Sequence, residues 1–214
     1  VYQRTIDIMA AFLAGIRDET GAVLEELNLG GGYGVRYTEE DETIDIPARL
    51  REVALHLRRE TEKHGLPMPH FLMEPGRSIV ADAGMTLYTV GSIKRIPGYK
   101  QYAAVDGGMT DNPRYALYQS RYTVYHAHKS GSMERFDVVG RCCESGDIIQ
   151  PGVELPGDTC RGDILAVCTT GAYNYSMASN YNRLPRPAVV MLTPDRIYEA
   201  VRRETFADLT ALDL

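Results

Sequence analysis

The hydrophobic pattern of this chain changes near Ala83, and this change constrains the fold more than any single motif. Before it, residues 4–19 repeat apolar side chains at helical spacing, and Gly21 is a typical helix stop. A second helix is predicted to begin after Asp45, with Pro47 in its first turn. The apolar runs VLEELNLGG and HFLMEPGR follow these helices and indicate strands. Helix, strand, helix, strand is the order of a parallel α/β fold.

After Ala83 the chain is rich in Tyr, Val, Ile and Thr, in short runs separated by Gly, Pro and Asp. This pattern is typical of an antiparallel β domain. The final stretch, PDRIYEAVRRETFADLTAL, indicates one or two terminal helices. We therefore expect an α/β part over residues 1–84 and a β domain with a helical tail over residues 85–214.

Composition excludes several classes of protein. The net charge of −6 and the scattered Lys and Arg residues argue against a nucleic-acid surface. No run approaches the ~18 apolar residues of a membrane span, and no signal-peptide pattern is visible. The four cysteines show no C-x-x-C spacing, so a zinc knuckle is not expected and no metal site is assigned. Their low density favours a reducing, cytoplasmic compartment.

A run of glycines, LNLGGGYG, follows the first predicted strand. Neither a dinucleotide fingerprint nor a phosphate-binding P-loop fits its spacing, because the required last glycine and the G-K-[ST] element are absent. Bare backbone at this point indicates either a plain turn or a ligand that approaches the main chain closely.

A second turn, MEPGRS, follows the second strand and contains Glu74 and Arg77. Ligands of parallel α/β folds sit at the carboxyl ends of strands, where two loops could direct N–H groups at one phosphate. A carboxylate beside a phosphate suits a ligand that also carries a positive group. Pyridoxal phosphate meets this condition, because its ring nitrogen is cationic when paired with an acid. The alternative is an ordinary surface pair between the two side chains.

Five motifs in order identify a resemblance that covers nearly the whole chain. They are LNLGGGYG, EPGRSIVADAG, VDGGMTDNPRYALY, CCESGD and GAYNYSMASNYNRLPRP. The chain resembles the barrel-fold, pyridoxal-phosphate-dependent amino-acid decarboxylases, and among them the diaminopimelate decarboxylases. The resemblance implies the C-terminal part of a (β/α)₈ TIM barrel followed by an antiparallel β-barrel or sandwich. It also implies a homodimer with the active site at the subunit interface.

The resemblance also implies how the cofactor is bound. Gly31, Gly32 and the Gly76–Arg77 backbone correspond to the phosphate-binding loops. Glu74 corresponds to the partner of the pyridine nitrogen, and holding that nitrogen protonated makes the ring a stronger electron sink. Tyr173 corresponds to a tyrosine that touches both cofactor and substrate. The alternative, one more core tyrosine among 14, is weak because the surrounding motif fits so well.

The substrate is implied in the same way. Arg77, Arg114, Tyr118 and Tyr173 correspond to positions that bind the amino acid, and the arginine fork suits the distal carboxylate of a diamino-dicarboxylic acid. Glu144 corresponds to the residue that recognises the distal ammonium group of the substrate. Relatives that act on ornithine carry aspartate there, so Glu144 favours diaminopimelate.

Cys143 corresponds to the cysteine that protonates the carbanion after CO₂ leaves, across the dimer interface. A thiol can donate a proton near neutral pH because its reference pKa is about 8.5. Cys142 is interpreted as a packing residue, since adjacent side chains on a strand point to opposite faces.

Three other polar residues have structural interpretations. His126 and His128 alternate on a predicted strand and could form a metal pair, but a solvent-facing strand is favoured because no third ligand is near in sequence. Asp106 is interpreted as a turn or loop residue.

The implied reaction removes one carboxylate from meso-diaminopimelate to give L-lysine and CO₂. The alternatives are a sister decarboxylase of another basic amino acid and a non-catalytic regulatory homologue. The family uses a lysine early in the barrel to bind the cofactor covalently. This chain has four lysines, and none of them corresponds to that position in the family. They are Lys63, Lys94, Lys100 and Lys129. We therefore expect this chain to be the C-terminal part of a longer enzyme.

Overall fold

The computed structural model describes all 214 residues, which form two compact units. The first unit comprises Val1–Arg36 and Asp41–Ile79, and the second comprises Tyr37–Glu40 and Val80–Leu214.

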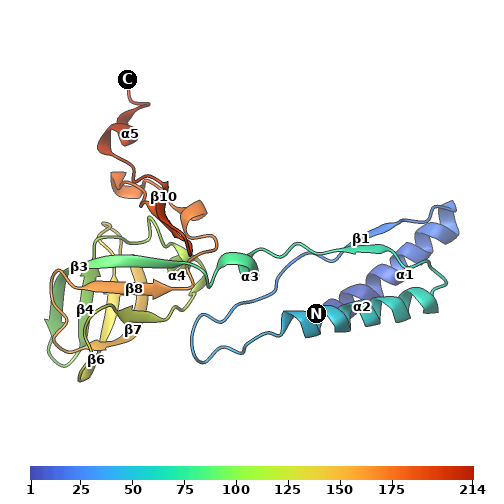
Figure 1. Cartoon of the computed structure of the whole chain (residues 1–214), viewed down its shortest axis with the longest axis horizontal. Helices are drawn as coiled ribbons and strands as arrows, with labels where there is room; N and C mark the ends of the chain where they lie inside the picture. Colours follow the sequence, from blue (N-terminus) through green and yellow to red (C-terminus); the bar gives the residue numbers. More distant parts are fainter. The chain divides into compact units, whose positions relative to one another are not determined.

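The first unit alternates helices and strands as the sequence predicts (Figure 1). Its elements are α1 (Tyr2–Thr20), β1 (Glu26–Asn28), α2 (Ile46–Lys63) and β2 (His70–Leu72), followed by the short α3 (Arg77–Val80). Strands β1 and β2 pair in parallel, with Leu27 opposite Phe71. The helices α1 and α2 pack along each other. This arrangement confirms the parallel α/β character of the first part.

Local signals in the sequence set the ends of both helices. Gly21 adopts φ 73° and donates its N–H to the carbonyl of Arg17 at 2.8 Å, which ends α1. Asp45 caps α2 by accepting the N–H of Ala48 at 2.9 Å, with Pro47 in the first turn. The apolar faces then close over a small core of Ile6, Leu13, Leu27, Leu29, Val53 and Leu57.

The second unit is built on a six-stranded sheet. Its strands are β3 (Met85–Ile96), β4 (Lys100–Val105), β5 (Val124–His126), β6 (Met133–Val139), β7 (Ile148–Pro156) and β8 (Ile164–Cys168). The strand order is β5-β8-β3-β4-β6-β7, and the edge strands β5 and β7 approach each other, so the sheet is almost closed. Phe136, Ile149, Leu155 and Leu165 are fully buried in its core.

One detail of this sheet differs from the expected antiparallel domain. Strands β4 and β6 pair in parallel, because the chain between them makes a long crossover that contains α4 (Arg114–Tyr118) and β5. The remaining pairs within the sheet are antiparallel. The fold class, α/β followed by all-β, is confirmed.

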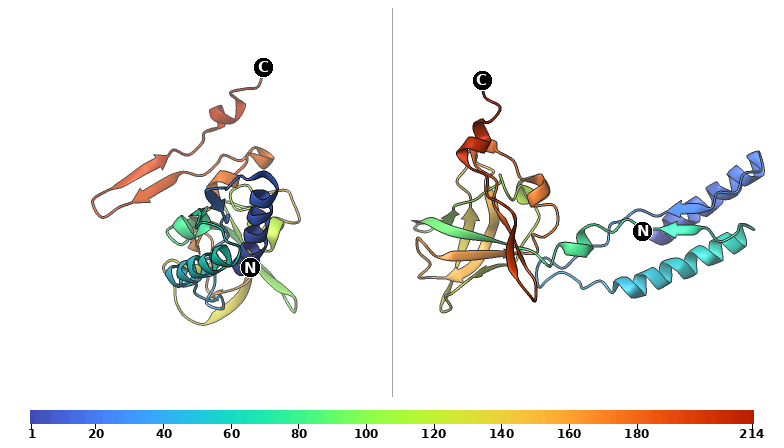
Figure 2. Two further views of the ribbon diagram at one scale, coloured as in Figure 1. Left: turned by 90° about the vertical axis from the view of Figure 1, so that its right-hand side faces the viewer. Right: turned by 45° about the horizontal axis from the view of Figure 1, so that its top comes forward.

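The prediction of one or two terminal helices is wrong over most of the tail. Residues Val189–Leu192 and Ile197–Val201 form an antiparallel hairpin, β9 and β10, which projects from the six-stranded sheet (Figure 2). Pro194 and Asp195 favour the turn, in which Thr193 donates its N–H to the carbonyl of Arg196 at 3.0 Å. Only α5 (Phe206–Thr210) is helical.

None of the helices combines the length and apolar character needed to cross a membrane.

Candidate active site

The glycine loop after β1 is shaped by a close approach to the loop after β2. Leu29 donates its N–H to Leu72 at 3.0 Å, and Glu74 donates its N–H to Gly30 at 2.9 Å, so the strand pairing continues into both loops. A Cβ at Gly31 would overlap the carbonyl oxygen of Glu74, so no other residue fits there. Gly32 adopts φ 100°, which disfavours any side chain.

Glu74 has a partner that sequence reasoning did not identify. The Asn28 side chain donates through Nδ2 to Glu74 Oε1 at 2.5 Å, and its Oδ1 accepts the N–H of Gly30 at 2.8 Å. Asn28 therefore ties the carboxylate to the glycine loop. Glu74 is otherwise exposed, so it remains accessible to a cationic ligand group. The position of Asn28, at the end of β1 and two residues before the first glycine of the loop, was the signal available in the sequence.

A cavity of about 630 Å³ adjoins the glycine loop within the first unit. Tyr2 and Tyr33 stand at its wall with ring centroids 5.3 Å apart, and the Tyr2 hydroxyl donates to the carbonyl of Gly31. Gly76 and Arg77 lie at the start of α3, where Gly76 accepts the N–H of Ile79 at 3.1 Å. Gly31 and Gly32 thus line this cavity, while Gly76 and Arg77 do not.

Replacing Gly31 by alanine should destabilise the protein by about 1–3 kcal/mol, the usual cost of overpacking a closed contact. The reason is that the new methyl group must displace the main chain of Glu74. The measurement is the free energy of unfolding in denaturant. Gly15→Ala is the matched control, because its Cβ meets nothing within 4 Å in the middle of α1, and it should be neutral or stabilising by about 0.5–1 kcal/mol. Equal stabilities of the two variants would contradict the close approach.

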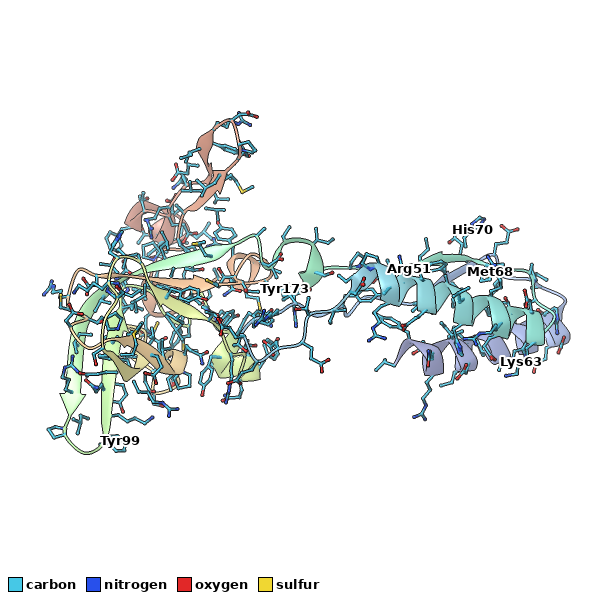
Figure 3. All side chains as sticks on the ribbon, turned by 60° about the horizontal axis from the view of Figure 1, so that its bottom comes forward. Arg51, Lys63, Met68, His70, Tyr99 and Tyr173 are labelled. Atoms are coloured by element: carbon cyan, nitrogen blue, oxygen red, sulfur yellow. The ribbon has the colours of Figure 1, made fainter.

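Three residues predicted to bind substrate meet in the second unit. Arg114 begins α4 and is only 5% exposed, and its guanidinium lies over the rings of Tyr118 and Tyr173, at 5.2 and 5.5 Å from their centroids. Its Nε is buried and has no hydrogen-bond partner. Tyr173, labelled in Figure 3, has left-handed backbone with φ 72°, which is uncommon for a residue with a side chain. Buried arginine with an unsatisfied donor is suited to a carboxylate ligand.

The two adjacent cysteines lie in the loop of residues 140–147 between β6 and β7. The strand argument for separating them is therefore wrong, but they do differ. Cys142 is half-buried and donates its N–H to Asp147 Oδ2 at 2.6 Å, whereas Cys143 is exposed and donates its N–H to Asn182 Oδ1 at 2.6 Å. Sequence reasoning gave no role to Asp147 or Asn182, although both fall inside motifs that it singled out.

Burial raises the pKa of the Cys142 thiol to about 11, and the nearby carboxylate of Asp147 adds to the effect. A raised pKa means that the thiol keeps its proton more tightly, so Cys142 is a weaker acid than an ordinary cysteine. This physical difference supports the interpretation that Cys142 packs and Cys143 reacts.

Glu144 follows Cys143 at the exposed tip of this loop. One carboxylate oxygen, Oε1, accepts the N–H of Gly146 at 3.2 Å and the hydroxyl of Ser145 at 3.3 Å. The side chain is therefore oriented by its own loop.

The interpretation of His126 and His128 as a solvent-facing pair is wrong for His126. Strand β5 ends at His126, whose side chain is 2% exposed and lies 3.1 Å from the carboxylate of Asp163. His128 instead donates its N–H to the His126 ring at 3.2 Å. Asp106 is a loop residue as interpreted, and it accepts the N–H of Thr89 at 2.8 Å.

One group of side chains on α1 and α2 has the composition of a metal site. His56 Nε2 lies 2.7 Å from Asp7, and Glu60 is close to both. Glu60 is already paired with Lys63 at 2.8 Å, which explains the group as a salt-bridge network between two helices.

None of the four lysines belongs to the loops that follow β1 and β2. Lys63 lies at the end of α2 (Figure 3), Lys100 pairs with Asp137 at 2.6 Å, and Lys129 pairs with Asp163 at 2.7 Å. Lys94 lies on β3. The strand ends at the glycine loop therefore carry no lysine.

These features define a chain of the pyridoxal-dependent decarboxylases. The family model described as "Pyridoxal-dependent decarboxylase, C-terminal sheet domain" matches residues 4–171, and the chain belongs to this family. It is 48% identical over 200 residues to diaminopimelate decarboxylase from Bacillus subtilis. The aligned region covers 92% of this chain and 45% of that protein. It is 44% identical over 200 residues, with the same coverage, to diaminopimelate decarboxylase from Halalkalibacterium halodurans.

A solved structure agrees with these relatives. Diaminopimelate decarboxylase from M. jannaschii in complex with L-lysine matches with a TM-score of 0.86 and 32% identity, over 98% of this chain and 47% of that chain. The chain thus spans about half the length of the relatives that it matches.

Proposed function

We propose that this chain supplies the cofactor-binding loops and the β domain of a diaminopimelate decarboxylase, which converts meso-diaminopimelate to L-lysine and CO₂. The main support for this proposal is the environment of Arg114. Its guanidinium lies over the rings of Tyr118 and Tyr173, and its buried Nε has no hydrogen-bond partner. Such a group suits the carboxylate of an amino-acid substrate. The names of the relatives, including one solved with L-lysine, support this substrate.

The residues of the first unit fit pyridoxal phosphate. The Gly31 and Gly32 backbone, with Gly76–Arg77, would bind the phosphate, and Glu74, held by Asn28, would pair with the pyridine nitrogen. When bound, the cofactor supplies the electron sink for the carbanion left by CO₂. Glu74 keeps the proton on the ring nitrogen, and the tight glycine contact fixes Glu74 relative to the phosphate loop.

The second unit would bind and protonate the substrate. Arg114 and Tyr118 would orient a carboxylate, with Tyr173 against the guanidinium. Arg77, which belongs to the first unit, would be a further substrate contact. Cys143 donates the proton that replaces CO₂. Its exposed position at a loop tip suits a donor that serves the partner subunit of a homodimer.

Two features of the whole protein belong to this proposal. A (β/α)₈ barrel completed by residues outside this chain would pair the open edges of β1 and β2. A cytoplasmic location fits the unpaired cysteines, because disulfides are rare in reducing compartments.

Shortening Glu144 to aspartate in the full-length enzyme should chiefly reduce kcat/KM for diaminopimelate. One methylene less withdraws the carboxylate from the distal ammonium, and a charge-assisted hydrogen bond of this kind contributes about 1.5–3 kcal/mol, or roughly 10–150-fold. The measurement compares kcat/KM for diaminopimelate and ornithine in both proteins. Ser145→Ala, which removes a hydroxyl donated to the same carboxylate, is the control for loop disturbance. An unchanged preference in Glu144→Asp would contradict the assignment, and turnover of ornithine by the wild type would favour the sister decarboxylase.

A further inference from the structure

The Cys143 loop is held by side chains from two different parts of the chain. Asp147 closes the loop from within, since its buried carboxylate accepts the N–H groups of Cys142 and Met109, both at 2.6 Å. Asn182 holds the next amide from outside, because its Oδ1 accepts the N–H of Cys143 at 2.6 Å. Consecutive amides are thus fixed at the point where the reactive thiol leaves the backbone.

Two glycines, Gly108 and Gly140, lie directly against the Asp147 carboxylate. A Cβ at Gly108 or at Gly140 would fall against the Asp147 carboxylate, so both loops can approach it only because these residues lack one. The carboxylate therefore joins the loop that follows β4 to the Cys143 loop.

Asn182 sits in a strained but well-supported turn. Its backbone is left-handed, with φ 55° and ψ 22°, a conformation that asparagine tolerates better than most residues with a side chain. The turn is tied to the C-terminal tail on both sides. Asn180 Nδ2 donates to Glu204 at 2.6 Å, and Arg186 pairs with the same Glu204 at 2.6 Å. Arg183 also donates to the carbonyl of Leu209 at 2.8 Å.

We propose that Asn182 is a positioning residue for proton donation: its side-chain oxygen holds the Cys143 amide and so aims the thiol and the adjacent Glu144. This proposal rests on the proposed decarboxylase function. It assigns a role to the SNYN segment, and it explains why the tail is fastened to that segment through Glu204. Asn182 acts through Cys143 and does not itself contact the reacting atoms.

The test compares two substitutions in the full-length enzyme. Asn182→Gly keeps the left-handed backbone accessible but removes the acceptor oxygen, whereas Asn182→Asp keeps an oxygen at the same place. We expect Asn182→Gly to speed hydrogen exchange in the peptide that contains Cys143 and to lower kcat about tenfold, since a shift of about 1 Å can cost up to about 100-fold. The solvent deuterium isotope effect on kcat should rise, because proton transfer becomes slower. Asn182→Asp should retain near wild-type values.

A control and the contrary outcomes complete the design. Gln119 also has left-handed backbone and a side-chain hydrogen bond, to Tyr115 at 3.1 Å, so Gln119→Gly should leave exchange around Cys143 unchanged. Unchanged exchange in Asn182→Gly would show that the anchor is absent. Faster exchange with unchanged kcat and isotope effect would show that it has no part in proton donation. A wild-type enzyme that does not decarboxylate diaminopimelate would instead overturn the proposed function, while exchange would still report on the anchor.

Discussion

Replacing Cys143 by alanine in the full-length enzyme should lower kcat for diaminopimelate by about 10²–10⁴-fold, the usual contribution of a general acid. Bound cofactor should be retained, because the residues proposed to hold its phosphate and its ring nitrogen lie in the first unit. The measurements are steady-state kinetics and the visible absorbance of the bound cofactor. A loss of absorbance that parallels the loss of kcat would show that the substitution disrupts cofactor binding and not proton donation.

The adjacent thiol provides the control for this prediction. Cys142→Ala removes a half-buried side chain with a pKa of about 11, so its effect on kcat should be small in comparison. Selective alkylation is a second measurement, in which exposed Cys143 should react before Cys142 at neutral pH and activity should fall with it. Equal kinetic defects in the two alanine variants would remove the distinction between the cysteines.

The parts of the fold that the sequence predicted are those with local causes. Gly21 ends α1 and Asp45 caps α2 through hydrogen bonds that span only a few residues, so the helix ends could be recognised from residue type and spacing. The β-rich second part follows from short apolar runs between turn residues. The run of glycines was ambiguous until the structure showed that Gly31 is packed against the main chain of Glu74, which is 43 residues away in sequence.

The parts that were predicted wrongly depend on distant pairing. The tail has the composition of a helix around Glu199, yet pairing with β9 makes β10 a strand. The cysteines were placed on a strand because they end the run RFDVVGRCC, whereas β6 stops at Val139 and Asp147 holds the residues that follow in a loop. Asn182 could not be connected to Cys143 from the sequence, since the two residues are 39 positions apart and nothing local links them.

The chain Val1–Leu214, expressed alone, should neither bind pyridoxal phosphate covalently nor decarboxylate diaminopimelate. Covalent attachment needs an uncharged amine, and three of the four lysine ammonium groups of this chain are stabilised instead. The hydrogen bond that Lys63 donates to Glu60 raises the pKa of Lys63, and hydrogen bonds donated to Asp137 and Asp163 do the same for Lys100 and Lys129. A raised pKa keeps each amine protonated to higher pH, so it lacks the free electron pair that attacks an aldehyde.

The remaining lysine, Lys94, is exposed on β3 in the second unit, whereas the glycine loop belongs to the first. The experiment adds pyridoxal phosphate to the chain, reduces with borohydride, maps modified lysines by mass spectrometry and assays lysine production. The enzyme from Bacillus subtilis serves as the positive control. It should produce lysine when assayed before borohydride is added, and after reduction it should be labelled at one lysine. Labelling of the chain should stay at the level of an unrelated lysine-containing protein. The reason is that exposed amines outside the phosphate-binding loops react only weakly with the aldehyde. Stoichiometric labelling at one lysine together with lysine production would show that the 214 residues contain a complete active site, and the division of roles proposed above would fail.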